Sequence, residues 1–155
     1  QRINNNMDNR DSLLQVVSEA YWSLNGYLKE GGREEISALV IAGGWVEGLH
    51  LACKNVTPGN TELKQRIAEQ KYALKDLIAL LNTYGDKEVL TSVIQDLNEV
   101  QQIFNDAKTN AAKTETSKDK SGTIVIGGAK KVEMSDETLA LVSAKIDAIR
   151  TKYIQ

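Results

Sequence analysis

Four stretches of this chain repeat apolar residues every three to four positions, which is the spacing of one face of an α-helix. They run from Asp8 or Asp11 to Lys29, from about Asn60 to Leu81, from Val89 to Ala107, and from Ser135 to Tyr153. In the last stretch the apolar residues alternate steps of three and four, as in the seam of a bundle helix. The pattern therefore predicts four amphipathic helices.

A fifth segment, 33–55, has a different pattern because residues 36–53 are apolar or small almost throughout. They hold three glycines, one of the two tryptophans, the only histidine and the only cysteine. A helix that is apolar nearly all round is expected to be buried nearly all round in a soluble protein. Gly43 and Gly44 are expected to let a neighbouring helix approach closely, while Trp45 fills space on the opposite side. Helix 33–55 is therefore predicted to be the central element of the fold.

Short connections join the first four helices, and short connections make neighbouring helices antiparallel. Residues 56–60, Val-Thr-Pro-Gly-Asn, interrupt the helical pattern between two of them. The predicted fold is all-α: an up-and-down bundle of four to five helices in a single domain, 1–155, with helix 33–55 innermost.

The region before the last helix follows no helical pattern. Residues 108–121 offer almost no apolar side chain to bury, so they are predicted to form a mobile connection. Residues 123–126 and 129–134 flank Gly127-Gly128, which predicts a small β-hairpin at 123–134 with a two-residue turn.

Composition excludes several classes of partner. The 155 residues carry a net charge of −2, and no aromatic residue lies among the lysines of 108–131, so no nucleic-acid partner is expected. One cysteine excludes an internal disulfide. Residues 36–53 reach the length of a membrane span, but Glu47 and His50 lie within them, which favours a buried helix over a transmembrane segment.

Glu47, His50 and Lys54 fall on one narrow side of helix 33–55. We interpret them as a polar strip that reaches solvent or pairs with a neighbouring helix. Glu47 and His50 also form the Glu-x-x-His unit of di-iron bundles, but those sites use the unit twice with two further glutamates, and this chain has one histidine. We therefore expect no metal and no cofactor, and keep a small-molecule or metal-binding bundle at Glu47 and His50 as an alternative.

A second alternative makes His50 a phosphate acceptor. The segment resembles histidine phosphotransfer bundles, in which a lysine and then a small residue follow the reactive histidine by one turn. Lys54 occupies that position, but Asn55 comes next. The role requires a ring that titrates freely and is reachable. No nucleophile motif such as Gly-x-Ser-x-Gly is present, so no catalytic residue is assigned and no enzymatic activity is expected.

Four residues form the predicted partner surface: Trp22, Tyr72, Ile124 and Ile126. Trp22 and Tyr72 project opposite the apolar faces of their helices, and exposed aromatic side chains often mark a contact surface. Ile124 and Ile126 lie at the edge of the predicted hairpin, which could accept a strand from a partner. The alternative for Trp22 is that the hairpin or the N-terminal tail covers it.

Residues 35–50, Glu-Ile-Ser-Ala-Leu-Val-Ile-Ala-Gly-Gly-Trp-Val-Glu-Gly-Leu-His, resemble a segment of uncharacterised all-helical envelope lipoproteins of Bacteroides-type bacteria. The resemblance implies a periplasmic or secreted helical domain with no known activity; a cytoplasmic location is the alternative. The expected function is that of a non-enzymatic helical bundle that binds a protein partner, or acts as a scaffold, at the bacterial cell envelope. The oligomeric state is left open.

Overall fold

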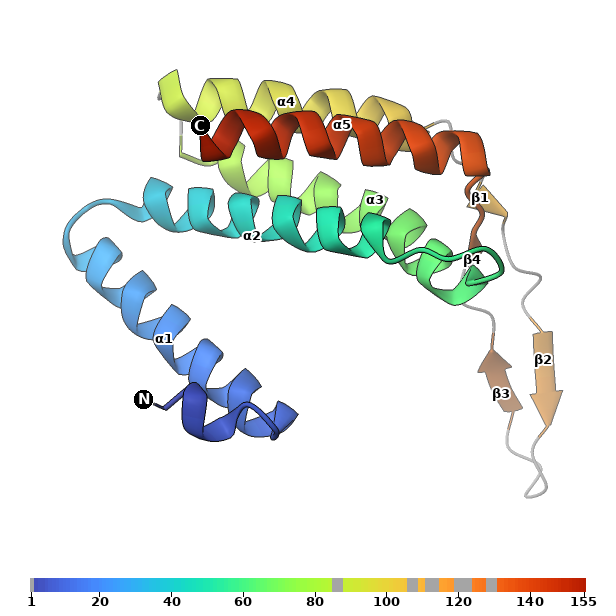
Figure 1. Cartoon of the computed structure of the whole chain (residues 1–155), viewed down its shortest axis with the longest axis horizontal. Coiled ribbons are helices and arrows are strands. Elements are labelled where there is room, and N and C mark those ends of the chain that lie inside the picture. The colour runs from blue at the N-terminus through green and yellow to red at the C-terminus, as the bar shows by residue number, and fades with distance from the viewer. Residues whose placement is uncertain (1, 85–87, 106–108, 111–114, 119–123, 128–130) are drawn as a thin grey trace. The chain divides into compact units, whose positions relative to one another are not determined.

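The computed structural model describes residues 2–84, 88–105, 109–110, 115–118, 124–127 and 131–155. Five α-helices make up most of them: α1 (Arg10–Glu30), α2 (Glu34–Lys54), α3 (Thr61–Asn82), α4 (Glu88–Asn105) and α5 (Asp136–Ile154) (Figure 1). A 3₁₀ turn, η1 (Asn4–Asn6), and four short strands are also present: β1 (Thr109–Asn110), β2 (Glu115–Lys118), β3 (Ile124–Gly127) and β4 (Lys131–Val132). The prediction of an all-α bundle of four to five helices is confirmed at this level.

The chain divides into two compact units, residues 1–41 and residues 42–155, so that α2 begins in the first and ends in the second. In the first unit, Asn9 caps α1 by accepting a hydrogen bond from the Ser12 N–H at 3.0 Å. The helix ends at the two glycines 31–32, where Gly32 adopts a φ of 62°. Ser37 of α2 donates a hydrogen bond to the Asn25 side chain at 2.8 Å and lies 3.4 Å from the Tyr21 hydroxyl.

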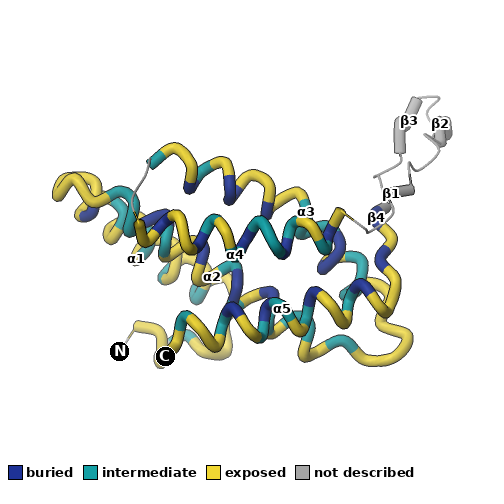
Figure 2. Tube along the Cα trace, turned by 90° about the horizontal axis from the view of Figure 1, so that it is seen from above, coloured by how far each residue is buried: buried dark blue, intermediate teal, exposed yellow. Residues whose placement is uncertain are grey.

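The second unit is built on the apolar seams of α3, α4 and α5. α4 packs against both α3 and α5, and buried positions recur along all three helices (Figure 2). Ten side chains of these helices are no more than 1% exposed: Ile67, Ala68, Leu74, Leu81, Leu90, Leu97, Val100, Phe104, Val142 and Ile146. The Asn60 and Ser135 side chains cap α3 and α5, each accepting a backbone N–H at 3.0 Å. These three helices therefore form the core that the sequence pattern predicts.

The prediction that helix 33–55 is central is wrong. α2 buries one side only, through Ala38, Ala42, Val46 and Leu49. The opposite side is exposed although it is apolar, with Val40 44%, Ile41 36% and Leu51 52% exposed. Among the described helices, α2 alone has the length and composition to cross a membrane, which is weak evidence of a span because mostly buried core helices and signal sequences pass the same test.

The predicted hairpin at 123–134 is also not supported. β3 pairs antiparallel with β2, so that Ile126 lies opposite Thr116, and β4 pairs with β1. The segment after Gly127-Gly128 therefore is not the partner of the segment before it. β4 packs on α3, and Val132 and Met134 are buried there. Part of the predicted mobile connection, 108–121, forms β1 and β2, and the rest of it lies outside the described residues. The mobility of the connection stays a prediction.

The glycines of α2 do not serve close helix packing. A Cβ atom built on Gly43, Gly44 or Gly48 would meet nothing within 4 Å. The expectation that Gly43 and Gly44 admit a neighbouring helix is therefore not met. The space beside these glycines is open, and a glycine inside a helix costs about 1 kcal/mol relative to alanine.

We expect Gly43→Ala and Gly44→Ala each to raise the free energy of unfolding by about 0.5–1 kcal/mol, because alanine favours the helix and the added methyl group has room. Urea titration followed by circular dichroism measures the change. Gly32→Ala is the control: the site is equally open, but its φ of 62° strains any L-residue, so stability should fall. A loss of stability in Gly44→Ala would show that a neighbour rests against this face.

Candidate functional site

The predicted polar strip of α2 meets α5. The Arg150 guanidinium donates to both Glu47 carboxylate oxygens, at 2.5 Å from Nε and 3.2 Å from Nη2. Asp147 accepts from two strip residues at once, with His50 Nδ1 2.7 Å from Oδ1 and Lys54 Nζ 2.5 Å from Oδ2. All three predicted strip residues are therefore paired, and we call these five side chains the α2–α5 cluster.

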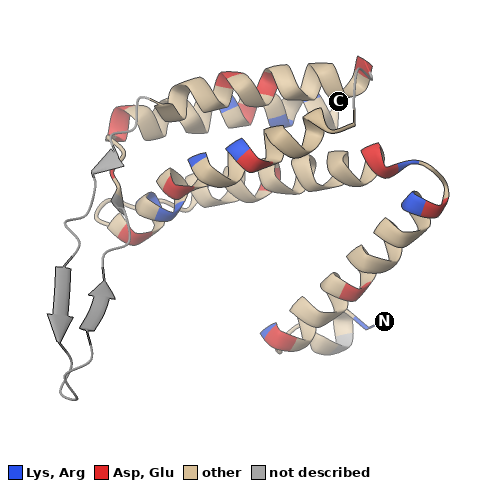
Figure 3. Cartoon of the chain, turned by 180° about the vertical axis from the view of Figure 1, so that it is seen from behind, with Lys and Arg blue, Asp and Glu red and all other residues tan. Residues whose placement is uncertain are grey.

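The hydrogen bonds within the α2–α5 cluster favour the charged forms of its two carboxylates. The hydrogen bonds from Arg150 lower the pKa of Glu47, and those from Lys54 and then His50 lower the pKa of Asp147. Two carboxylates are matched by two cations, so the cluster is neutral when the imidazole is neutral. Figure 3 shows that α2 otherwise carries little charge along its length. The cluster thus neutralises the few charged groups near the C-terminal half of an apolar helix.

His50 is oriented rather than free. A carboxylate only accepts hydrogen bonds, so the Nδ1–H of His50 donates to Asp147. The side chain is only 18% exposed. A phosphate-accepting histidine needs a reachable ring, and a ring that is hydrogen-bonded to Asp147 and mostly covered does not favour that alternative.

Cys53 lies one turn after His50 on α2. Burial, and then the negative charge of Asp147, raise the pKa of its thiol to about 11. The thiol is therefore protonated at neutral pH and is a weak nucleophile. Among the described residues, no group of three or more His, Cys, Asp or Glu side chains is placed to hold a metal ion.

The residues of the predicted partner surface belong to different units of the chain, and that surface stays a prediction. Trp22 is 71% exposed on α1 in the first unit, and Tyr72 is 44% exposed on α3 in the second unit, with Lys71 Nζ 5.8 Å from its ring centroid. Ile124 and Ile126 lie in β3, and their side chains are outside the described residues.

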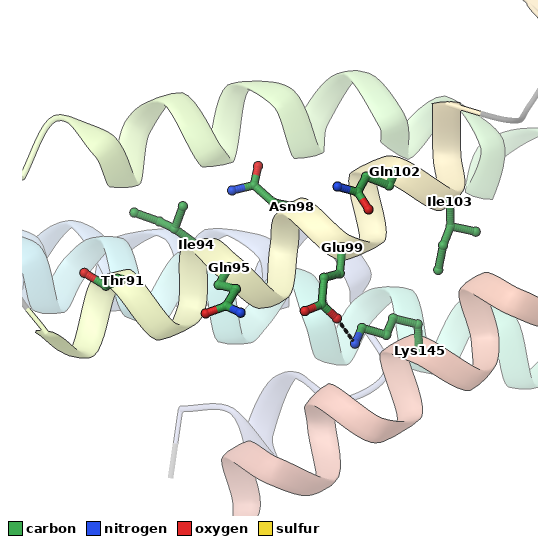
Figure 4. A pocket seen from close by; sticks show the side chains of 8 residues that line it. All are labelled: Thr91, Ile94, Gln95, Asn98, Glu99, Gln102, Ile103 and Lys145. Atoms are coloured by element: carbon green, nitrogen blue, oxygen red, sulfur yellow. Dashed lines mark hydrogen bonds and ion pairs between the residues drawn. The ribbon is translucent and has the colours of Figure 1, made fainter.

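A shallow hollow of about 760 Å³ runs along α4 (Figure 4). Neutral amide side chains of Gln95, Asn98 and Gln102 line it, together with Lys145 of α5. Lys145 forms an ion pair with Glu99. The hollow therefore offers hydrogen-bonding groups but no reactive group.

Sequence reasoning placed the polar strip and missed its partners, Asp147 and Arg150. These two residues are three apart on α5, the same spacing as Glu47 and His50 on α2. Matching i, i+3 charges on two predicted helices is therefore the signal that could have found them.

Asp147→Asn should lower the free energy of unfolding at pH 7 by about 1 kcal/mol, because it weakens charge-assisted hydrogen bonds at a partly exposed site. The pKa of Asp147 is lower in the folded chain, so its contribution is present above the unfolded pKa of about 3.9 and is lost as the pH falls through the folded value. The gap between the urea midpoints of the variant and the wild type should therefore be constant from pH 7 to pH 5 and begin to narrow below about pH 4. Glu30→Gln controls for the loss of one exposed carboxylate; a gap that does not narrow between pH 5 and pH 3 would contradict the prediction.

Cys53 should react with iodoacetamide at pH 8 at least about 100-fold more slowly in the folded chain than in urea, because its thiolate fraction is far smaller. Mass spectrometry of samples quenched over time measures both rates. Equal rates would show that folding neither shields the Cys53 thiol nor raises its pKa.

No protein-family model, no curated protein and no solved structure matches this chain. Its function is therefore argued from its own surfaces.

Proposed function

We propose that this chain is a non-enzymatic helical domain that binds a helix of a protein partner through the apolar stripe of α1. The stripe consists of Leu14, Val17, Tyr21, Leu24 and Leu28, which we call the α1 seam. Its steps of three, four, three and four residues are those of a helix that packs along another helix.

Exposure of the α1 seam is the observation that carries the proposal. Leu14 is 55%, Val17 57% and Leu24 42% exposed, whereas among the described residues of α1 only Leu28 is buried. Apolar side chains with this spacing and this exposure are unusual on a helix that has no partner to bind.

The residues beside the α1 seam indicate the chemistry of the partner. Leu13, Ala20 and Tyr27 follow one edge of the seam and widen it into a broad apolar face, with Tyr27 72% exposed. Ser18 and Asn25 follow the middle of the other edge, and the charged residues of that edge, Asp11 and Lys29, lie near the two ends of the helix. A wide uncharged face fits an amphipathic helix or helical groove whose contact surface is itself apolar.

Two further points support a binding role. Every charged member of the α2–α5 cluster is paired, so it has no nucleophile or free acid to offer to a reaction. The resemblance of residues 35–50 to envelope lipoproteins supports a place at the bacterial cell envelope. That location is part of the proposal.

Val17→Asp and Leu24→Asp should each weaken partner binding at least tenfold, because each places a carboxylate inside an apolar contact. The purified chain would be immobilised, its partners identified by mass spectrometry of captured envelope proteins, and the affinity for the recovered partner measured by surface plasmon resonance. Ser18→Asp is the matched control, since it adds the same charge one position away from Val17.

Thermal unfolding of the same variants supplies the opposing test. The proposal expects melting temperatures close to that of the wild type, because exposed positions tolerate charge. If Val17→Asp unfolded the chain, the α1 seam would belong to its own core and the proposal would fail. It would fail equally if Ser18→Asp weakened binding as much as Val17→Asp.

A further inference from the structure

A small apolar groove lies between α2 and α3, within the second unit. Trp45, Gly48 and Ala52 line it from α2, and Leu63, Arg66 and Ile67 line it from α3. It encloses about 340 Å³. Small-molecule pockets range from about 300 to 1,000 Å³, so the groove has the size for one small ligand.

The groove is open because α2 carries small residues along it. Gly48 has no side chain, and a Cβ atom there would meet nothing within 4 Å. Ala52 follows one turn later and adds only a methyl group. Close packing therefore does not require a glycine at position 48. A glycine inside a helix lowers the stability of the helix relative to alanine, so its presence here needs another reason.

The polar groups of the groove wall bond to one another. Trp45 Nε1 donates to Gln70 Oε1 at 3.2 Å, and Gln70 Nε2 donates to the Arg66 carbonyl oxygen at 3.3 Å. These bonds tie the indole to α3 and use the hydrogen-bonding capacity of its N–H. The groove therefore presents mainly carbon atoms to a ligand.

Arg66 is the charged group in the lining. Its Nε and Nη2 bond to one oxygen of Glu62, at 3.4 Å and 3.1 Å, and the side chain is 69% exposed. No hydrogen bond joins Nη1 to any of the residues that the structure describes. A guanidinium has five donors and suits carboxylate geometry, so Arg66 can also bind an anionic group at the edge of the groove.

We propose that this α2–α3 groove binds the hydrocarbon chain of a single-chain carboxylate, a medium-chain fatty acid, with its head group at Arg66. The apolar lining suits the chain, and the single cation at the edge suits the carboxylate. The inference does not depend on the α1 seam or on the proposed function.

The test titrates dodecanoate into the full chain, at concentrations below micelle formation, and follows Trp45 fluorescence in a Trp22→Phe background. Saturable binding is expected, with isothermal titration calorimetry as the second readout. Gly48→Leu fills the groove and should abolish binding. Gly43→Leu is the matched control: it enlarges another open glycine of α2 that does not line the groove, so binding should persist.

Arg66→Gln separates the head group from the chain. It should weaken dodecanoate binding at least fivefold and leave dodecanol binding unchanged. Because Arg66 is well exposed, this variant decides the proposal even if Gly48→Leu fails to fold. Absence of saturable binding, equal losses in the two glycine variants, or equal affinity of Arg66→Gln and wild type for dodecanoate would overturn the proposal.

Discussion

Mutual burial of the α3, α4 and α5 seams is the interaction on which the rest of the second unit depends. Leu74, Leu97 and Phe104 are fully buried there, and a buried side chain of this size contributes about 1.5–3 kcal/mol relative to an exposed one. The same packing fixes α5, and α5 carries both Asp147 and Arg150. The packing of the core thus places Asp147 and Arg150 where the polar residues of α2 can pair with them. The α2–α5 cluster therefore orients α2 more than it stabilises the fold.

The position of α2 shows why residue type alone misled the prediction. Small residues interrupt no apolar pattern, yet a glycine has no side-chain carbon to bury. Gly43, Gly44 and Gly48 thus let the helix look uniformly apolar without adding side-chain area, and the apolar area of its outer side comes from Val40, Ile41 and Leu51. The free energy of burial follows area, so a helix of this composition is stable with one side in the core and the other in solvent.

The features that sequence predicted correctly are local ones. The start of α3 near Asn60, the start of α5 near Ser135, the end of α1 near Lys29 and the seam of α5 are each set by residues within one or two turns. The pairing of β3 with β2 is different, because antiparallel register depends on which segments meet, and short strands specify it weakly. The partners of Glu47 and His50 were likewise beyond local reasoning, since they lie about a hundred residues away on another helix.

The candidate sites of this chain differ in whether their groups already have partners. A polar group gains little further interaction once its hydrogen bonds are made, and every charged member of the α2–α5 cluster has a partner. An apolar surface in water keeps its full driving force until something covers it. The shape of that surface then decides what can bind: the broad stripe of α1 matches another helix, whereas the narrow groove beside Gly48 matches one chain of carbon atoms. The proposed recognition therefore uses the apolar surfaces of this chain rather than the polar strip that holds its only histidine.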